Sequence, residues 1–486
     1  MGADQRTNEV LGTLLAELGW SPNQLAGALN GLLGPRSVAR STVSDWLNRN
    51  RLPREPLPTV VAHLISDVLD REVPVAQLWS GRAQPAEFWV PADHGLQLPW
   101  TATSTVEILD DWLRHTGGSI GMDRRIFLAV SGASLTAPVW GYVERLGIRG
   151  DSLAALADGR RSITITSTMV DAMAATTAGI RKLGNTEGGN EDNLQFVHHH
   201  LIWVAKLLRQ ARFSSSAVAN RLLAEWAQLA QLAAWMAMDT RRYGLSQRYV
   251  TSGLRAAHTA GDRSVGTYLL SDLGSWRVIQ GDLGDGVELG RAARDAVELA
   301  NAAHEVARST PAAVRALAAS GFAKAQAAVG NTRGFHAAAE EARALLDSPG
   351  ALDARPPYLA WFDSGALETQ LASSALLLAA VSSRDGRALL NDATEAFGRT
   401  AADLARSPRS VVVAGATLAR SQVAAGDLER VVPTTQVALN RLPTVRSRRC
   451  ELILHRREGD PAALHPARRP AAICSLHDQL RATHTP

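Results

Sequence analysis

The sequence predicts an all-α protein with two helical parts, and three observations lead to this prediction. Apolar residues recur at helical spacing from residue 9 onward, and from about residue 194 the helical pattern is nearly continuous. Pairs of glycine with aspartate or asparagine, such as Gly261-Asp262, interrupt this second part and mark helix ends. Small residues recur on the expected helix faces, as in GRAARDAVELA, and such faces allow helices to pack closely in repeated pairs.

Three short helical patterns lie within residues 9–54, and each has its own start or stop signal. The first helix is expected to end at Gly19, because glycine readily adopts the backbone conformation that terminates helices. Ser21 and Pro22 are expected to begin the second helix, since serine caps helix N-termini and proline suits the first turn. A third helix is predicted from about residue 41 to residue 48. Three helices of this kind are typical of a helix-turn-helix unit.

The third predicted helix has an apolar side and a polar side. Val43, Trp46 and Leu47 are expected to face inward, which leaves hydroxyl, amide and guanidinium groups outside. Such groups contact base edges and phosphates in DNA complexes. The residues predicted to read bases are Ser41, Thr42, Ser44, Asp45 and Asn48. The residues predicted to contact phosphates are Arg36, Arg40, Arg49, Arg51 and Arg54. The alternative is an ordinary three-helix core with a solvated outer face.

The N-terminal domain is expected to cover residues 1–80, because two more helical patterns follow at 57–69 and 75–79. Residues 81–123 have the composition of a linker, rich in proline, glycine and alanine. Two tryptophans in this stretch suggest that part of it docks against a folded surface.

Residues 124–193 are interpreted as a helical connecting region. A β-branched run at 163–168 could pass for a strand, but its flanks favour a loop that enters a helix. Residues 184–193 contain several glycines and asparagines and are predicted to form a loop.

Residues 194–442 are predicted to form a tetratricopeptide-like helical repeat domain, with a plain irregular helical bundle as the alternative. Residues 443–486 form an arginine-rich C-terminal segment whose role the sequence leaves open. Aromatic and basic residues near the predicted helix junctions could contact a ligand or a partner on the concave face of such a domain. The candidates are Trp226, Arg241, Arg242, Tyr243, Tyr249 and Trp276.

Composition limits the class of protein. The chain has 486 residues, of which 46% are hydrophobic and 20% charged, so it can bury sizeable cores. Its net charge is only +4, so the argument for DNA binding depends on local arrangement and not on bulk charge. Cys450 and Cys474 are far apart and are expected to be free thiols in a reducing cytoplasm. The sequence has no apolar run long enough for a membrane span and no signal-peptide pattern, so a membrane partner is not expected.

No catalytic residues and no cofactor are predicted, since phosphate-binding glycine motifs and nucleophile motifs are absent from the sequence. The run His198-His199-His200 is the obvious candidate for a metal site. Adjacent helical residues point about 100° apart, so three such side chains cannot share one ion without further ligands. These histidines are therefore interpreted as a polar helix start, and the chain is not expected to be an enzyme.

The run STVSDWLNRNRLPREP resembles the recognition helix and exit loop of XRE-type (lambda-repressor-like) regulators. In that family the helix ends with an aromatic residue, a polar and basic turn, and a proline. The matching residues are Trp46, Asn48, Arg49, Arg51 and Pro53. The connection at residues 31–39 is longer here than the family's short turn, and Arg36 lies within it.

The whole chain is similar to large actinomycete regulators that join such a domain to a tetratricopeptide-like array. The runs that carry this similarity are LPREPLPTVVAHLI, DDWLRHTGGSIGMDRRIFLAVSGASLTAP and RRYGLSQRYVTSGLRAAHTAGD. Several members repress sporulation and antibiotic production in streptomycetes. The resemblance implies a cytoplasmic, repressor-type regulator that binds a double-stranded DNA operator.

The residues and the resemblance together predict a homodimer that binds two half-sites about one helical turn apart. The repeat domain would dimerise and sense a peptide, a small molecule or a protein partner. One alternative is a protein-interaction scaffold without specific DNA binding, which the near-neutral N-terminal domain favours. Another is a regulator whose operator affinity changes when a peptide pheromone binds.

Overall fold

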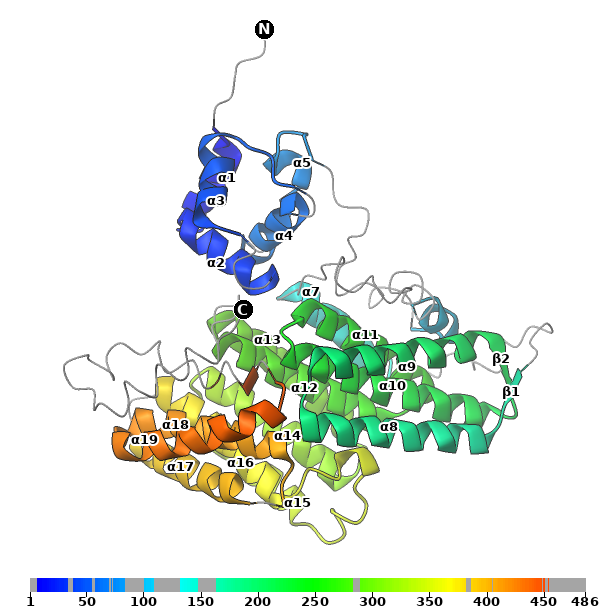
Figure 1. The fold of residues 1–486 in the computed structure, drawn as a ribbon. Helices are drawn as coiled ribbons and strands as arrows, with labels where there is room; N and C mark the ends of the chain where they lie inside the picture. Colours follow the sequence, from blue (N-terminus) through cyan, green and yellow to red (C-terminus); the bar gives the residue numbers. More distant parts are fainter. Residues whose placement is uncertain are drawn as a thin grey trace.

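The computed structural model is built almost entirely of α-helices (Figure 1). It describes residues 7–33, 38–54, 57–69, 71, 73–83, 100–108, 132–146, 163–282, 289–381, 386–403, 405–447, 449, 450 and 453. The all-α prediction is confirmed for these residues. Most of the segments interpreted as a linker (81–123) and as an arginine-rich C-terminal segment (443–486) lie outside the described ranges.

A small N-terminal unit contains five helices around its own hydrophobic core. The helices are α1 (Glu9–Glu17), α2 (Pro22–Leu33), α3 (Arg40–Asn48), α4 (Leu57–Leu69) and α5 (Val75–Leu78). Each helix contributes buried apolar side chains to this core, including Leu11, Leu29, Trp46, Ile65 and Leu78. Burial of these side chains is what stabilises helices that are too short to persist alone in water.

Local sequence signals set the ends of the first two helices, as predicted. Gly19 follows α1 with φ +64°, a left-handed conformation that glycine adopts without strain. The Ser21 hydroxyl accepts a hydrogen bond from the backbone N–H of Gln24 (3.3 Å). The Gln24 side chain in turn accepts one from the backbone N–H of Ser21 (2.7 Å). This reciprocal pair is a capping box, and it fixes the start of α2.

The next described segments are a helix at 102–108, α7 (Ala133–Glu144), β1 (Ile163–Ile165), α8 (Ser167–Glu187), α9 (Glu191–Gln210) and β2 (Ala211–Phe213). Trp100, from the segment interpreted as a linker, is 6% exposed. Its ring lies 5.2 Å from those of Tyr142 and His258, so this part of the segment is packed against the helical body.

Two predictions for this region were wrong. Residues 163–165 form a strand instead of a loop, because they pair in parallel with residues 211–213, which are distant in sequence. The loop predicted at 184–193 is reduced to three residues, since α8 continues to Glu187 and α9 begins at Glu191. Gly189 fits there because a Cβ atom would lie 2.7 Å from the Cβ of Asp239.

The remaining helices form one array in which each helix packs on the next. They are α10 (Ser216–Asp239), α11 (Tyr243–Ala260), α12 (Arg263–Asp282), α13 (Leu289–Ala307), α14 (Ala312–Ala328), α15 (Thr332–Leu346), α16 (Ser364–Val381), α17 (Gly386–Ala402), α18 (Pro408–Ala425) and α19 (Leu428–Arg441). Two 3₁₀ turns accompany them, η3 (Pro357–Leu359) and η4 (Leu442–Thr444). The even-numbered helices also pack on one another in sequence, so they form an inner layer. Figure 1 shows these helices as a broad body with the N-terminal unit above it.

Glycines with positive φ end helices of the array where the sequence predicted breaks. Gly261, Gly330 and Gly426 have φ values of +71°, +74° and +78°. The break predicted at Gly281 is also found, because α12 ends one residue later at Asp282. Gly261, Gly330 and Gly426 are in the left-handed region that terminates helices, so the turn chemistry of the sequence defines the ends of these helices.

The two ends of the array meet at a buried carboxylate, Asp239, which is 0% exposed. Arg409 of α18 binds it through two nitrogens, at 2.8 Å and 2.7 Å. Ser447 donates to it from the segment after η4 (3.2 Å), and Arg449 lies 4.0 Å away. α18 also packs on α8. This group of four residues, called the Asp239 cluster below, therefore holds the last helices against the first ones.

Within the described residues, none of the helices is both long enough and apolar enough to cross a membrane.

Candidate nucleic-acid interface

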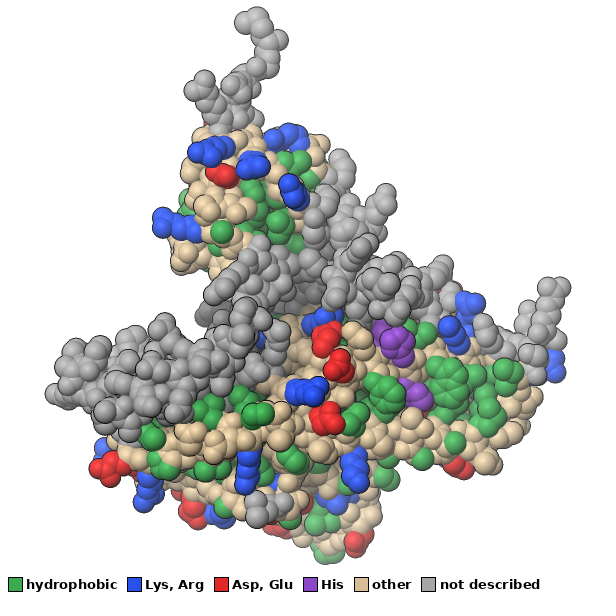
Figure 2. All heavy atoms as spheres, viewed as in Figure 1, with side chains coloured by type: hydrophobic (Ala, Val, Ile, Leu, Met, Phe, Trp, Pro, Cys, Tyr) green, Lys and Arg blue, Asp and Glu red, His purple; other side chains and the backbone are tan. Residues whose placement is uncertain are grey.

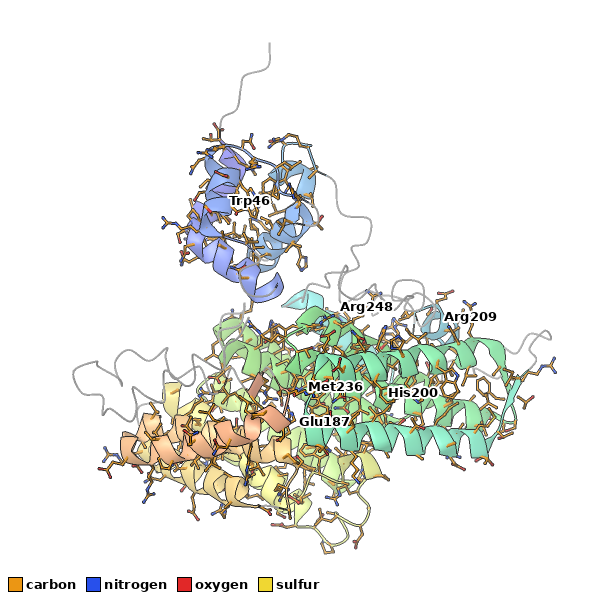
Figure 3. The ribbon with its side chains drawn as sticks, in the orientation of Figure 1. Trp46, Glu187, His200, Arg209, Met236 and Arg248 are labelled. Atoms are coloured by element: carbon orange, nitrogen blue, oxygen red, sulfur yellow. The ribbon has the colours of Figure 1, made fainter. Side chains whose placement is uncertain are left out.

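Helix α3 is anchored to the N-terminal unit by its apolar side. Val43 is 0% exposed and Trp46 is 2% exposed. The Trp46 ring meets the edge of the Trp79 ring at 6.1 Å, and Trp79 donates from its indole nitrogen to the carbonyl of Pro58 (3.1 Å). Figure 3 shows Trp46 in the interior of the unit. This packing fixes the rotation of α3 about its axis and so determines which residues face outward.

Asn30 fixes the start of α3 after the longer connection. Its side-chain amide donates to the carbonyl of Val38 (2.9 Å), and its side-chain oxygen accepts from the backbone N–H of Val38 (2.7 Å). Val38 itself is 3% exposed. The chain therefore returns to a defined position on α2 just before α3 begins. The residue that precedes the helix is Ala39, whose side chain offers no hydrogen-bond acceptor to the first amides of α3.

The residues predicted to read bases lie on the outer side of α3. Ser41 and Asn48 are exposed, and Thr42, Ser44 and Asp45 are partly exposed. Residues 41, 44, 45 and 48 share one face, because positions three and four apart are neighbours on a helix. The Ser44 hydroxyl donates to the carbonyl of Arg40 (3.1 Å), so its oxygen keeps acceptor capacity.

Asp45 differs from the other residues of this face because it pairs with neighbouring arginines. Arg49 lies 3.1 Å from one carboxylate oxygen and Arg51 lies 3.7 Å from the other. The side chains of both arginines remain more than 70% exposed, at 78% and 73%. The carboxylate therefore holds two cations at the C-terminal end of α3.

The predicted phosphate-contacting arginines surround this face. Arg40, Arg49, Arg51 and Arg54 are exposed, whereas Arg36 lies outside the described residues. Figure 2 shows basic side chains gathered on the end of the N-terminal unit that points away from the array.

Sequence reasoning missed Arg82, which supports the loop after α3. Its guanidinium donates to the carbonyl of Asn50 (3.0 Å). Asn50 has φ +46°, a conformation that asparagine tolerates better than most residues. No sequence pattern marks Arg82 or Asn30, because their partners lie 32 and 8 residues away.

The residues predicted to contact a ligand or partner do not form a common surface, and for three of them that prediction was wrong. Trp226, Tyr243 and Tyr249 are 2%, 7% and 1% exposed. They fill the core because wide helix faces in this array are buried on both sides. Burial also raises the pKa of the Tyr249 phenol, which shares a hydrogen bond with His198 Nδ1 (2.8 Å).

The other three residues have different surroundings. Arg242 forms an ion pair with Glu191 (2.8 Å), and Arg241 has φ +65° in the turn before α11. Trp276 is 6% exposed but lines a cavity inside the array.

The three adjacent histidines lie in the middle of α9, so their interpretation as a helix start was wrong. His198 is buried, whereas His199 is exposed. In the described part of the chain, no group of three histidine, cysteine or carboxylate side chains is arranged to hold a metal ion.

Residues 11–78 match a family model described as the SP15 N-terminal domain. The matched range runs from α1 to the last residue of α5, so it coincides with the N-terminal helical unit. The comparisons with curated proteins and with solved structures found no match to this chain.

Proposed function

We propose that this protein is a sequence-specific DNA-binding transcriptional regulator, in which α2 and α3 act as a helix-turn-helix and α3 enters the major groove. The observation that carries the proposal is the outer face of α3, where Ser41, Ser44 and Asn48 lie side by side. Hydroxyl and amide groups on one helix face are suited to base edges. By resemblance, we further propose that it acts as a repressor in development or secondary metabolism.

The surroundings of α3 support a position against the DNA backbone. Exposed arginines lie at both of its ends, Arg40 at the start and Arg49 and Arg51 after the finish. The first amides of α3 follow Ala39, so they are free of any cap from that side chain and can donate to a phosphate. In this arrangement the arginines bind the backbone on either side of the groove while the polar face reads bases.

We also propose that the array is a tetratricopeptide-like domain that dimerises the protein and senses a partner. The inner layer of even-numbered helices, each packed on its odd-numbered neighbour, supports this proposal. A two-fold dimer would place two α3 helices on half-sites about one turn of DNA apart.

The proposal is tested by selecting binding sites from random-sequence DNA with the full-length protein and then measuring affinity for the selected site at several salt concentrations. Asn48→Ala should lose about 1–3 kcal/mol and relax the preference at one base position. Arg49→Ala should weaken binding to all sequences alike and reduce the salt dependence by about one counterion.

Arg399→Ala is the matched control, because Arg399 is also exposed and pairs with a carboxylate four residues earlier, Glu395, but lies on α17. It should bind like the unaltered protein. Failure to select any site, together with no salt-sensitive DNA binding, would favour a protein-interaction scaffold instead.

A further inference from the structure

The array contains a cavity of about 1090 Å³ that is partly open to solvent. Its walls come from α8, from the inner-layer helices α10, α12, α14, α16 and α18, and from α17 and the loop after it, with Trp361 from the turn before α16. A volume of this size is at the upper end of the range for small-molecule sites.

The Asp239 cluster limits what can enter this cavity. Two of its members, Arg409 and Arg449, are part of the cavity wall. They tie the last helices to α10, so the cavity is bounded on this side. A concave space of this volume suits a small molecule better than a folded partner.

The wall has an aromatic part that suits a flat apolar body. Trp235, Tyr268, Trp276 and Trp361 all line the cavity. The rings of Tyr268 and Trp361 lie 6.4 Å apart at an angle of 36°. Aromatic side chains bury large apolar areas and stack favourably on other rings.

The charges of the wall favour an anion. Six basic and four acidic side chains line the cavity. Two of the basic ones pair with carboxylates of the same wall: Arg420 with Asp282 (3.0 Å) and Arg406 with Asp363 (2.8 Å). Two more, Arg409 and Arg449, pair with Asp239. Lys324 of α14 differs from them, because within the described part of the chain its ammonium makes no hydrogen bond and no ion pair within 4 Å. Burial lowers the pKa of this ammonium to about 8, although the carboxylates of Asp272 and Asp282 act in the opposite direction.

A second polar group points to a ligand at the same place. Ser271 of α12 is 4% exposed and lines the cavity, and its hydroxyl has no hydrogen-bond partner among the residues that the structure describes. A Cβ atom at Gly321 would lie 3.8 Å from the Cβ of Ser271, so α12 and α14 approach closely there. Lys324 lies one turn beyond Gly321 on α14. Buried hydroxyls without a partner are uncommon in proteins, and a bound ligand would satisfy this one.

We propose that this cavity binds a small organic anion with a flat apolar body, whose acidic group contacts Lys324 and Ser271 and whose body lies against Trp276 and Trp361. This inference goes beyond the proposed DNA binding and does not depend on it. The site supplies a charge-assisted contact at one end and aromatic surface at the other.

The test uses 8-anilinonaphthalene-1-sulfonate, an aromatic sulfonate, in fluorescence titrations of the full-length protein. We expect saturable binding of one molecule per chain. Lys324→Met should weaken binding at least tenfold, Lys324→Arg should largely retain it, and Ser275→Phe should weaken it at least tenfold by obstructing the space one helical turn from Ser271. Ser275 lines the cavity beside these groups. Thermal unfolding of each variant establishes that it is folded.

The chain offers matched controls. Lys206 is an exposed lysine on α9, and Phe196 and Trp203 are exposed apolar residues of the same helix that could bind the dye nonspecifically. Lys206→Met and Phe196→Ser/Trp203→Ser should bind like the unaltered protein. The proposal is overturned if no saturable binding occurs, if folded Lys324→Met and Ser275→Phe proteins bind normally, or if the α9 variants lose the site.

Discussion

Asp45 is the one carboxylate on the outer face of α3, and it lies among groups suited to DNA. Its two oxygens pair with Arg49 and Arg51, so the carboxylate offsets part of the positive charge that these arginines present to phosphates. A carboxylate also repels the phosphate backbone. We therefore assign Asp45 a role in limiting nonspecific affinity, in addition to any contact with a cytosine amino group.

Asp45→Asn should raise the affinity for nonspecific DNA severalfold and steepen its salt dependence. The substitution removes one negative charge and releases two exposed arginines whose pairing contributes less than about 1 kcal/mol. Affinity for a selected site and for a scrambled duplex would be measured across a salt series. An unchanged salt slope would show that the carboxylate does not restrain these arginines.

Asp272, in the wall of the cavity, should give the protein a measurable pH dependence of stability. Burial raises the pKa of its carboxyl from an ordinary value of 3.8 to about 7, although Gln231, Arg181, Lys324 and Arg449 act in the opposite direction. The folded protein therefore binds this proton more tightly than the unfolded chain does. The stabilisation of the folded state by this tighter proton binding is complete below pH 3.8 and is lost as the pH rises to about 7.

Asp272→Asn should remove that loss, so the variant should gain stability relative to the unaltered protein as the pH rises from 5 to 8 in thermal unfolding experiments. Asp171→Asn, at an exposed residue of α8, is the control and should show no such trend. A constant difference between Asp272→Asn and the unaltered protein across this range would mean that the carboxyl ionises normally.

Among the elements, α3 depends on a contact that lies outside it. The side chain of Asn30, on α2, makes two hydrogen bonds with the backbone of Val38 and thereby sets where α3 begins. The rotation of α3 then follows from the burial of Val43 and Trp46. Both features are required for the polar face to point outward.

Asn30→Ala should loosen the start of α3, since two partly buried hydrogen bonds contribute about 1–2 kcal/mol together. Hydrogen–deuterium exchange in peptides that cover residues 38–48 should become faster by about tenfold, and DNA affinity should fall. Asn23→Ala, at an exposed position of α2, should leave exchange within about twofold. Equal exchange in the two variants would exclude this role for Asn30.

The helix boundaries that could be predicted from the sequence are those set by local chemistry. The capping residues Ser21 and Gln24, and the glycines at 19, 261, 330 and 426, act within a few residues of themselves. What could not be predicted depends on distant partners. The strand at 163–165 exists because it pairs with 211–213, and Tyr249 is buried against His198.

In the candidate site, too, features set by local sequence could be predicted and features that depend on distant partners could not. The periodicity of α3 predicted which residues face outward, since Val43 and Trp46 had to be buried. It could not reveal that Asp45 binds two arginines, that Arg82 supports the following loop, or that a cavity lies within the array. All three features arise from tertiary packing or from side-chain geometry, and the spacing of apolar residues in the sequence does not encode either.

At the scale of the whole molecule, the Asp239 cluster joins helices that are about 170 residues apart in sequence. The fully buried carboxylate of Asp239 accepts hydrogen bonds from two nitrogens of Arg409 and from the hydroxyl of Ser447. The side of the cavity that Arg409 and Arg449 bound depends on this contact.

Asp239→Asn should therefore destabilise the array by about 3–5 kcal/mol, because it leaves buried guanidinium groups without their counter-ion. Chemical denaturation of the full chain measures the change. Glu395→Gln removes an exposed carboxylate from a surface pair on α17 and should alter stability by less than about 1 kcal/mol. If the two variants unfold alike, the cluster does not hold the array together.

The most direct test of the central claim is genome-wide DNA occupancy of the tagged protein in its source cells, compared with an Arg40→Ala/Asn48→Ala double variant expressed at the same level. The account predicts discrete sites that share a pseudo-palindromic sequence and that disappear in the double variant. Absence of discrete sites, or sites that persist unchanged in the variant, would contradict the assignment of α3 as the helix that reads DNA.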